Sequence, residues 1–189
     1  MKISRKLNVV FPITVEDGSV IYIHSTPISR AVIDTNARVL GLTFAEIYTG
    51  GLGPLAGPRV AATILRDIAT ERNIASKVEM SLFNEVHRLT NVLLPTASAG
   101  WETIPYVELL RKDIIDEDSA SEVENALIYF TVALSMHLTD ERAAAMEAMT
   151  MLWKAHFTSS NVTEYRNSLT ISTGAVNTGV KAIVSSIPS

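Results

Sequence analysis

Cysteine is absent from this chain of 189 residues. Disulfide bonds, thiolate nucleophiles and zinc sites built from cysteine sulfur are therefore excluded. Excess positive charge is also lacking, because 16 basic residues face 20 acidic ones and the formal net charge is −4. Nonspecific binding to nucleic acid or to an anionic membrane needs a basic surface field. The composition thus predicts that neither nucleic acid nor a membrane is a partner.

Long hydrophobic runs are missing as well, since no segment approaches the roughly 18 apolar residues of a membrane span. Charged residues interrupt the apolar ones in residues 1–18, and no small-residue cleavage site follows, so a signal peptide is not expected. Hydrophobic residues still make up 47% of the chain and charged residues 19%, which suffices for a sizeable core. These features predict one domain with an appendage, located in a reducing cytoplasm.

Two kinds of hydrophobic periodicity follow one another along the chain. Alternating apolar and polar residues predict a β-hairpin over residues 3–24, in which Asp17 and Gly18 form a two-residue turn. From Pro27 onward, apolar residues recur at the three-to-four spacing of helices. The predicted helices cover about residues 27–49, 58–72, 76–94, 106–113, 120–137, 141–157 and 161–169. Capping boxes are indicated by the pairs Ser76 with Glu79, Ser119 with Glu122, and Asn161 with Glu164.

These elements predict a mainly α fold, with an N-terminal β-hairpin followed by a bundle of about six to seven helices. A single domain, residues 1–169, would contain the hairpin (3–24) and the helical bundle (27–169). An extended, Ser/Thr-rich C-terminal tail would occupy residues 170–189. No internal repeat and no coiled-coil heptad run is visible in the sequence.

The C-terminal tail, residues 170–189, is polar in composition yet carries apolar residues at intervals. Its charge is limited to Lys181. Such a segment is too apolar for a simple linker, so we expect it to dock either on its own domain or on another chain. The candidate partner-binding residues in the tail are Val176, Val180, Ile183 and Val184.

A methionine cluster between residues 136 and 151 offers a second candidate surface. Met146, Met149 and the nearby Trp153 are its candidate partner-binding residues, because methionine adapts to irregular partner surfaces. Ordinary filling of the core is the alternative reading of the same residues.

Motifs that carry chemistry are not found. The glycine-rich segment at residues 50–59 lacks the Gly-Lys-Ser/Thr ending of a phosphate-binding loop and follows a helix, which favours a helix connector. No GxSxG sequence frames a serine nucleophile, and the acidic residues near position 120 suit the start of a helix. We therefore predict a non-enzymatic protein with no catalytic residue and no cofactor.

Metal binding is not predicted either. None of the histidines has a partner at the spacing of a local metal-binding motif, which leaves only a site assembled from distant segments. The four histidines are His24, His87, His137 and His156.

Several stretches, spread over about residues 1–179, resemble a family of proteins from the tail-gene region of bacteriophages with long, non-contractile tails. They are Ile28–Arg30, Ala56–Ala62, Leu89–Leu93, Gly100–Thr103, Glu122–Leu127 and Asn161–Tyr165. The resemblance implies a tail assembly chaperone of the host cytoplasm, which binds the tail tape-measure protein and recruits tail-tube subunits.

The resemblance assigns no residue a chemical role, so two other functions stay open. One is a structural virion component of the tail or of the head–tail connector. The other is a small hydrolase or nucleotide-dependent factor with an unrecognised site. Whether the chain forms a homo-oligomer is also left open, although its mean hydropathy of +0.22 would suit one.

Overall fold

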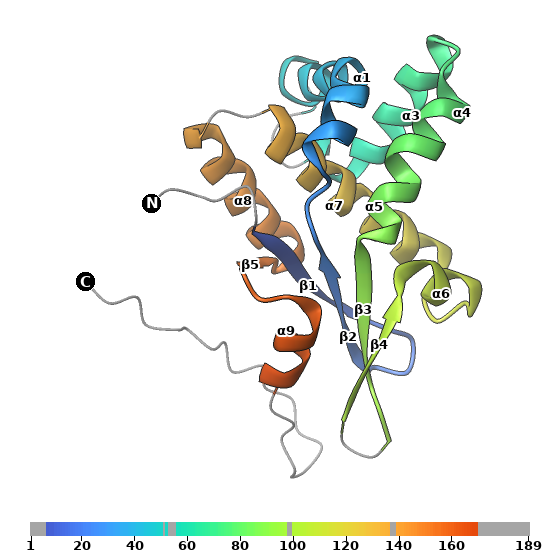
Figure 1. Ribbon diagram of the computed structural model, residues 1–189, viewed down its shortest axis with the longest axis vertical. Coiled ribbons are helices and arrows are strands. Elements are labelled where there is room, and N and C mark those ends of the chain that lie inside the picture. Colours follow the sequence, from blue (N-terminus) through green and yellow to red (C-terminus); the bar gives the residue numbers. More distant parts are fainter. Residues whose placement is uncertain (1–6, 51, 53–55, 98–99, 137–138, 170–189) are drawn as a thin grey trace.

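The computed structural model describes residues 7–50, 52, 56–97, 100–136 and 139–169. These residues form an α+β fold, in which helices gather beside a five-stranded antiparallel sheet (Figure 1). The strand order is β4-β3-β2-β1-β5. The strands are β1 (Asn8–Thr14), β2 (Val20–Ser25), β3 (Thr90–Pro95), β4 (Trp101–Pro105) and β5 (His156–Thr158). The prediction of a mainly α fold is therefore wrong.

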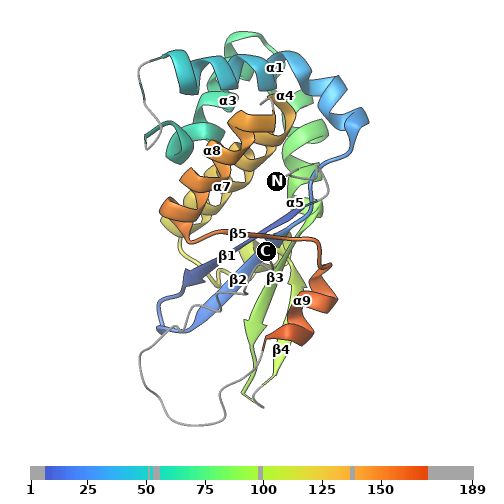
Figure 2. The ribbon, with the colours of Figure 1, turned by 90° about the vertical axis from the view of Figure 1, so that its left-hand side faces the viewer.

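The helices divide into a main group and one helix apart from it (Figure 2). The main group is α1 (Arg30–Thr49), the 3₁₀ helix η1 (Gly57–Val60), α3 (Ala61–Glu71), α4 (Ala75–Val78), the π-helical segment η2 (Glu79–Phe83), α5 (Asn84–Arg88), α6 (Tyr106–Arg111), α7 (Glu117–Met136) and α8 (Thr139–Trp153). The helix apart is α9 (Val162–Ser168). It lies across the sheet from α7 and α8 in Figure 2.

The N-terminal hairpin is confirmed as β1 and β2, but its turn is longer than predicted. The last cross-strand pair joins Thr14 to Val20. The turn is closed by a hydrogen bond of 2.8 Å from the Gly18 N–H to the Val15 carbonyl. Gly18 has a φ of 81°, which a residue without a Cβ adopts at little cost. The position of the turn at Asp17 and Gly18 was therefore predicted correctly, but the predicted length of two residues was wrong.

Three strands occupy segments for which a helix or a loop was predicted. The end of the predicted helix 76–94 is β3, the gap between the predicted helices 76–94 and 106–113 contains β4, and the end of the predicted helix 141–157 is β5. These strands are only three to six residues long. A short apolar run has no period long enough to distinguish a strand from a helix, so pairing with distant strands decided the outcome.

The main core lies between one face of the sheet and the helices. Helix α7 is its centre, because nearly every residue from Val123 to Leu134 is buried and the helix packs against α1, α3 and α8. A helix that is buried on all sides has this uniformly apolar character. The sheet contributes residues such as Val9, Phe11 and Ile23 to the same cluster.

The two faces of the sheet differ because successive residues of a strand point to opposite sides. We call the face that packs on the main helices the inner face and the opposite one the outer face. Phe157 of β5 points inward and its ring lies 6.1 Å from that of Phe130 on α7. Val10 and Leu93 point outward, are fully buried, and are not part of the main core cluster. The sheet therefore supports a second, smaller layer beneath α9.

Candidate functional site

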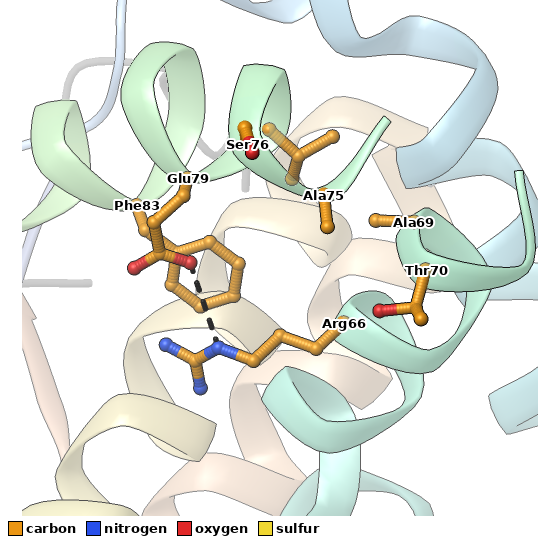
Figure 3. A pocket seen from close by; sticks show the side chains of 8 residues that line it. Arg66, Ala69, Thr70, Ala75, Ser76, Glu79 and Phe83 are labelled. Carbon is orange, nitrogen blue, oxygen red and sulfur yellow. Dashed lines mark ion pairs between the residues drawn. The ribbon is translucent and has the colours of Figure 1, made fainter. Parts of the chain in front are cut away.

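A small cavity of about 290 Å³ opens between α3, α4 and η2 (Figure 3). Arg66 of α3 and Glu79 of η2 face one another across it, with 3.6 Å between the arginine Nε and a carboxylate oxygen. The Arg66 guanidinium carbon also lies 4.0 Å from the centre of the Phe83 ring, a cation–π contact. The remaining lining residues are small or apolar, so this cavity offers few groups that could orient a ligand.

The buried end of Arg66 is held by Glu124 of α7. Both oxygens of the Glu124 carboxylate accept hydrogen bonds from Arg66, and one of them also lies 3.1 Å from His87 Nε2. Burial would raise the pKa of Glu124, but the bonds from His87 and Arg66 outweigh it and lower the pKa to about 2. The arrangement joins α3, α5 and α7 through hydrogen bonds to one carboxylate. We interpret it as a structural link within the helical layer.

The outer face of the sheet holds a different set of side chains. Its polar and aromatic members come from four strands and from α9. We call this set the outer layer, and it consists of Asn8, Tyr22, His24, Trp101, Thr103, His156 and Tyr165.

Strand register places the two histidines of the outer layer on either side of one valine. Val10 of β1 pairs with His24 on β2 and with His156 on β5. The ring of Tyr165, which α9 supplies, lies 5.9 Å from the His24 ring and 5.3 Å from the His156 ring. Structure thus brings together two histidines that are far apart in sequence.

The carbonyl of Ser160 anchors the chain where it crosses onto the outer face. It lies 2.7 Å from Asn8 Nδ2 and 3.1 Å from His24 Nε2. A carbonyl only accepts hydrogen bonds, so His24 Nε2 carries a hydrogen and, in the neutral ring, Nδ1 is a bare acceptor. His24 is fully buried, and burial lowers its pKa, which favours this neutral form.

Three buried polar atoms of the outer layer have no hydrogen-bond partner among the described residues. They are His24 Nδ1, Trp101 Nε1 and Thr103 Oγ1. The first is an acceptor, the indole N–H is a donor, and the hydroxyl serves as either. A buried polar atom without a partner costs about 1–3 kcal/mol, and native proteins contain few of them. Three such atoms lie on this one small surface of the described residues.

Helix α9 covers the outer layer but is weakly held. Its N-terminus is stabilised by the predicted capping box, in which Asn161 accepts bonds from the helix and Glu164 accepts one from the Asn161 N–H. None of its residues is buried. Its contact with the sheet depends largely on Tyr165, whose ring lies 6.2 Å from that of Tyr22. Few buried apolar contacts are typical of a segment that opens at low cost.

The outer layer also contains groups whose protonation depends on their surroundings. Partial desolvation, and then the nearby His24, lower the pKa of His156. Burial, and then Tyr22, raise the pKa of Tyr165 to about 12. These pKa shifts favour the neutral forms of His24, His156 and Tyr165 at neutral pH.

The predicted partner-binding residues are spread over different environments. Met149 and Trp153 are only 1% and 7% exposed, and the Trp153 indole donates to Glu122 at 3.1 Å. Both side chains lie in the core, which agrees with the alternative interpretation that these residues fill the core. Met146 is half-buried, whereas Met151 on the same helix is 67% exposed. Residues Val176, Val180, Ile183 and Val184 lie outside the described residues.

Sequence reasoning missed the outer layer. Tyr22 and His24 alternate with the buried Ile21 and Ile23, a pattern in which the second face of the strand is itself aromatic and polar. That alternation was the available signal. Strand pairing with the unrecognised β4 and β5 supplied the other members, and no local motif revealed them.

The remaining histidines do not add a metal centre to the described part of the chain. His87 lies beside Glu124, and His137 falls outside the described residues. Among the described residues, no group of three or more His, Asp or Glu side chains is arranged to hold a metal ion.

Within the described segments, no helix combines the length and apolar character needed to cross a membrane. Comparison of the chain with protein-family models, with curated proteins and with solved structures found no match.

Proposed function

We propose that this chain is a non-enzymatic assembly chaperone for a bacteriophage tail, acting in the host cytoplasm. In this proposal it binds a segment of the tail tape-measure protein on the outer layer and helps to recruit tail-tube subunits. The resemblance of the sequence suggests the biological setting. The observation that carries the proposal is the set of three unpartnered polar atoms on the outer layer.

The chemistry of these atoms suits a peptide partner. A peptide backbone presents an N–H donor and a C=O acceptor at each residue, so one segment supplies a donor to His24 Nδ1 and an acceptor to the Trp101 indole. Tyr22 and Trp101, whose rings lie 5.4 Å apart, add apolar area beside these atoms. Hydrogen bonds to backbone give affinity with little sequence requirement, which a chaperone needs for varied segments.

The weakly held α9 provides the means of entry. Tyr165 makes the principal contact between α9 and the strands of the outer layer. The residues of α9 are all at least partly exposed. Displacing this helix would therefore expose the outer layer without disturbing the main core. A partner that replaced the Tyr165 contacts would offset the cost of moving the helix.

Co-expression with the tape-measure protein encoded beside this chain tests the proposal. We expect the chain to keep that protein soluble and to co-purify with it. Trp101→Ala should weaken the co-purification by about tenfold or more, since it removes an aromatic contact and a donor. Met80→Ala is the matched control, because it removes a side chain of η2 that is 74% exposed and lies outside both candidate surfaces, so it should have no effect.

Two results would contradict the proposal. One is a tape-measure protein that stays insoluble and does not co-purify; the other is an equal loss of binding in both variants. Mass spectrometry of purified particles distinguishes the structural alternative, because a virion component stays in the particle whereas a chaperone is released.

A further inference from the structure

Two side chains of the sheet hold the segment that leads into α9. The Ser160 carbonyl lies 2.7 Å from Asn8 Nδ2 on β1 and 3.1 Å from His24 Nε2 on β2. Helix α9 begins two residues later, at Val162. Because none of the residues of α9 is buried, these two hydrogen bonds and the ring contacts of Tyr165 are the main contacts that attach it to the sheet. We call the Ser160 carbonyl and its two donors the latch.

His24 is the member of the latch that can gain a proton. Its side chain is fully buried, and the ring of Tyr165 lies 5.9 Å from the imidazole. Nε2 already carries the hydrogen that the Ser160 carbonyl accepts, so an added proton would go to Nδ1. That atom is buried and has no hydrogen-bond partner among the described residues. Protonation would therefore place a charge and an unpaired donor in a site closed to water.

The strands around His24 supply no opposite charge within the described part of the chain. On β1 and β3, the residues paired with it are the uncharged Val10 and Asn91. The titratable side chains near it are two phenols and a second imidazole, namely Tyr22 on β2, Tyr165 on α9 and His156 on β5. An imidazolium at His156 would repel one at His24 rather than stabilise it.

The charged side chains of α9 bond to their own helix. Glu164 accepts a hydrogen bond from the Asn161 N–H, and Arg166 donates to Asn167. Both bonds lie on the exposed surface, whereas His24 is fully buried. Neither charge therefore pairs with the His24 ring while α9 lies on the sheet.

We propose that the latch is a proton-sensitive switch that controls whether α9 covers the outer layer. With a neutral His24, the latch is closed and α9 lies on the sheet. A proton on Nδ1 creates an imidazolium, which reaches water when the segment from Ser160 through α9 moves away. The outer layer then opens while the main core stays folded. The switch is a property of the free chain; only its role in admitting a partner rests on the proposed function.

The direction of the pH effect follows from the difference between the closed and open states. Burial lowers the pKa of His24 in the closed state, whereas an open, hydrated His24 has an ordinary value of about 6.5. Below pH 6.5 the open state therefore binds more protons than the closed state. The equilibrium constant for opening should rise by up to about tenfold per pH unit until the pKa of the closed state is reached.

Amide hydrogen exchange, followed by NMR at pH 7.5, 6.5 and 5.5, measures this opening. The Tyr165 amide is a suitable reporter, because it donates to the Asn161 carbonyl at 2.8 Å. A helix of seven residues is not stable once it is detached, so its amides exchange when the latch opens. The protection factor corrects for the intrinsic pH dependence of exchange.

We expect the protection factor at Tyr165 to fall about three- to tenfold from pH 7.5 to 5.5. At each pH it should stay at least about tenfold below the protection of the α7 amides, because α9 opens locally whereas α7 exchanges only when the core opens. In the same samples, the His24 ring should titrate with a pKa below 6.5. That titration needs no variant, and a value at or above 6.5 would contradict the proposal.

His24→Gln removes the titrating group and keeps an amide donor for the Ser160 carbonyl. In this variant the protection factor at Tyr165 should change by less than about twofold over the same pH range, whatever its absolute value. His87→Gln is the matched control. It removes a histidine of the helical layer and should preserve the pH dependence of the parent chain.

Three further results would overturn the proposal. They are a pH-independent protection factor at Tyr165 in the parent chain, equal protection of Tyr165 and the α7 amides, and a full pH dependence that survives His24→Gln. Co-purification of the tape-measure protein at pH 7.5 and pH 6 tests the role of the switch separately. Stronger binding at pH 6 supports that role, and equal binding at both values rejects it. A complete lack of binding would reject the proposed function and leave the switch intact.

Discussion

The same strands place apolar side chains on the inner face of the sheet and a mixture of polar and aromatic side chains on its outer face. On the inner face, β1 and β2 bury Val9, Phe11 and Ile23 against the helices in a continuous apolar cluster. On the outer face, the neighbouring residues include a fully buried histidine with an unpaired ring nitrogen. An apolar face is stabilised by any close-packed cover, because apolar burial and dispersion contacts do not depend on direction. A buried polar face is fully stabilised only when each donor and acceptor has a hydrogen-bond partner.

The two sides of the sheet also differ in how completely their polar groups are paired. Arg66 and Glu124 on the helical side are charged, yet their hydrogen bonds are mutually satisfied. On the outer side, His24 Nδ1 and Trp101 Nε1 are neutral atoms but lack partners among the described residues. A protein that needed the outer face for stability alone would be more stable with apolar residues there. The unpaired polar atoms therefore fit the binding role that we propose for the outer face.

The largest expected effect contrasts a side chain on each face. Phe11→Ala, on the inner face, should lower the free energy of unfolding by about 3–5 kcal/mol through lost burial and a cavity. Tyr22→Ala, on the outer face, should cost about 1–2 kcal/mol, because Tyr22 is only partly buried. Denaturant unfolding measures both. Similar losses for the two variants would show that the outer layer is as much a part of the core as the inner one.

A change of pH should affect the outer face first. Burial lowers the folded-state pKa of His24, and similar causes lower that of His156, while the unfolded chain keeps ordinary values of about 6.5. Below pH 6.5 the unfolded state therefore binds more protons than the folded state. Stability should be greatest above this pH and should fall below it by up to about 1.4 kcal/mol per pH unit through the buried His24. The exposed His156 should contribute less, because solvent screens its interactions.

Thermal or denaturant unfolding between pH 7.5 and 5 would measure this loss, with the pH range chosen above the ordinary carboxylate pKa values of about 4. His156→Gln should remove part of the slope and leave the main core unchanged. A stability that stays constant from pH 7.5 to 5 in the parent chain would show that neither histidine resists protonation.

The smallest expected effect compares two buried hydroxyls. Thr43 on α1 donates to the Val39 carbonyl at 2.9 Å, so Thr43→Val should cost about 1 kcal/mol. Thr103 Oγ1 has no partner among the described residues. Thr103→Val should therefore be neutral or should stabilise the chain by up to about 1 kcal/mol. A comparable loss in both variants would mean that the Thr103 hydroxyl is satisfied.

Local signals were read correctly where a few neighbouring residues decide the conformation. Gly18 marked the hairpin turn, and Asn161 with Glu164 formed the predicted capping box. Helix α7 was recognised because its apolar residues run for many turns, and its actual start differs from the predicted one by three residues. Another predicted cap failed, since Ile74 precedes the helix where Ser76 was expected to cap it.

Sequence alone was sufficient for the absence of cysteine chemistry, the net charge, the N-terminal hairpin and the longer helices, because composition and short-range periodicity carry that information. Only the tertiary structure decided that Thr90–Pro95, Trp101–Pro105 and His156–Thr158 are strands, since each is too short to show a period and its hydrogen-bond partners are distant in sequence. That pairing in turn brought His24, Trp101 and Tyr165 onto one face. The candidate binding surface thus arises from strand order, which no local pattern in the chain encodes.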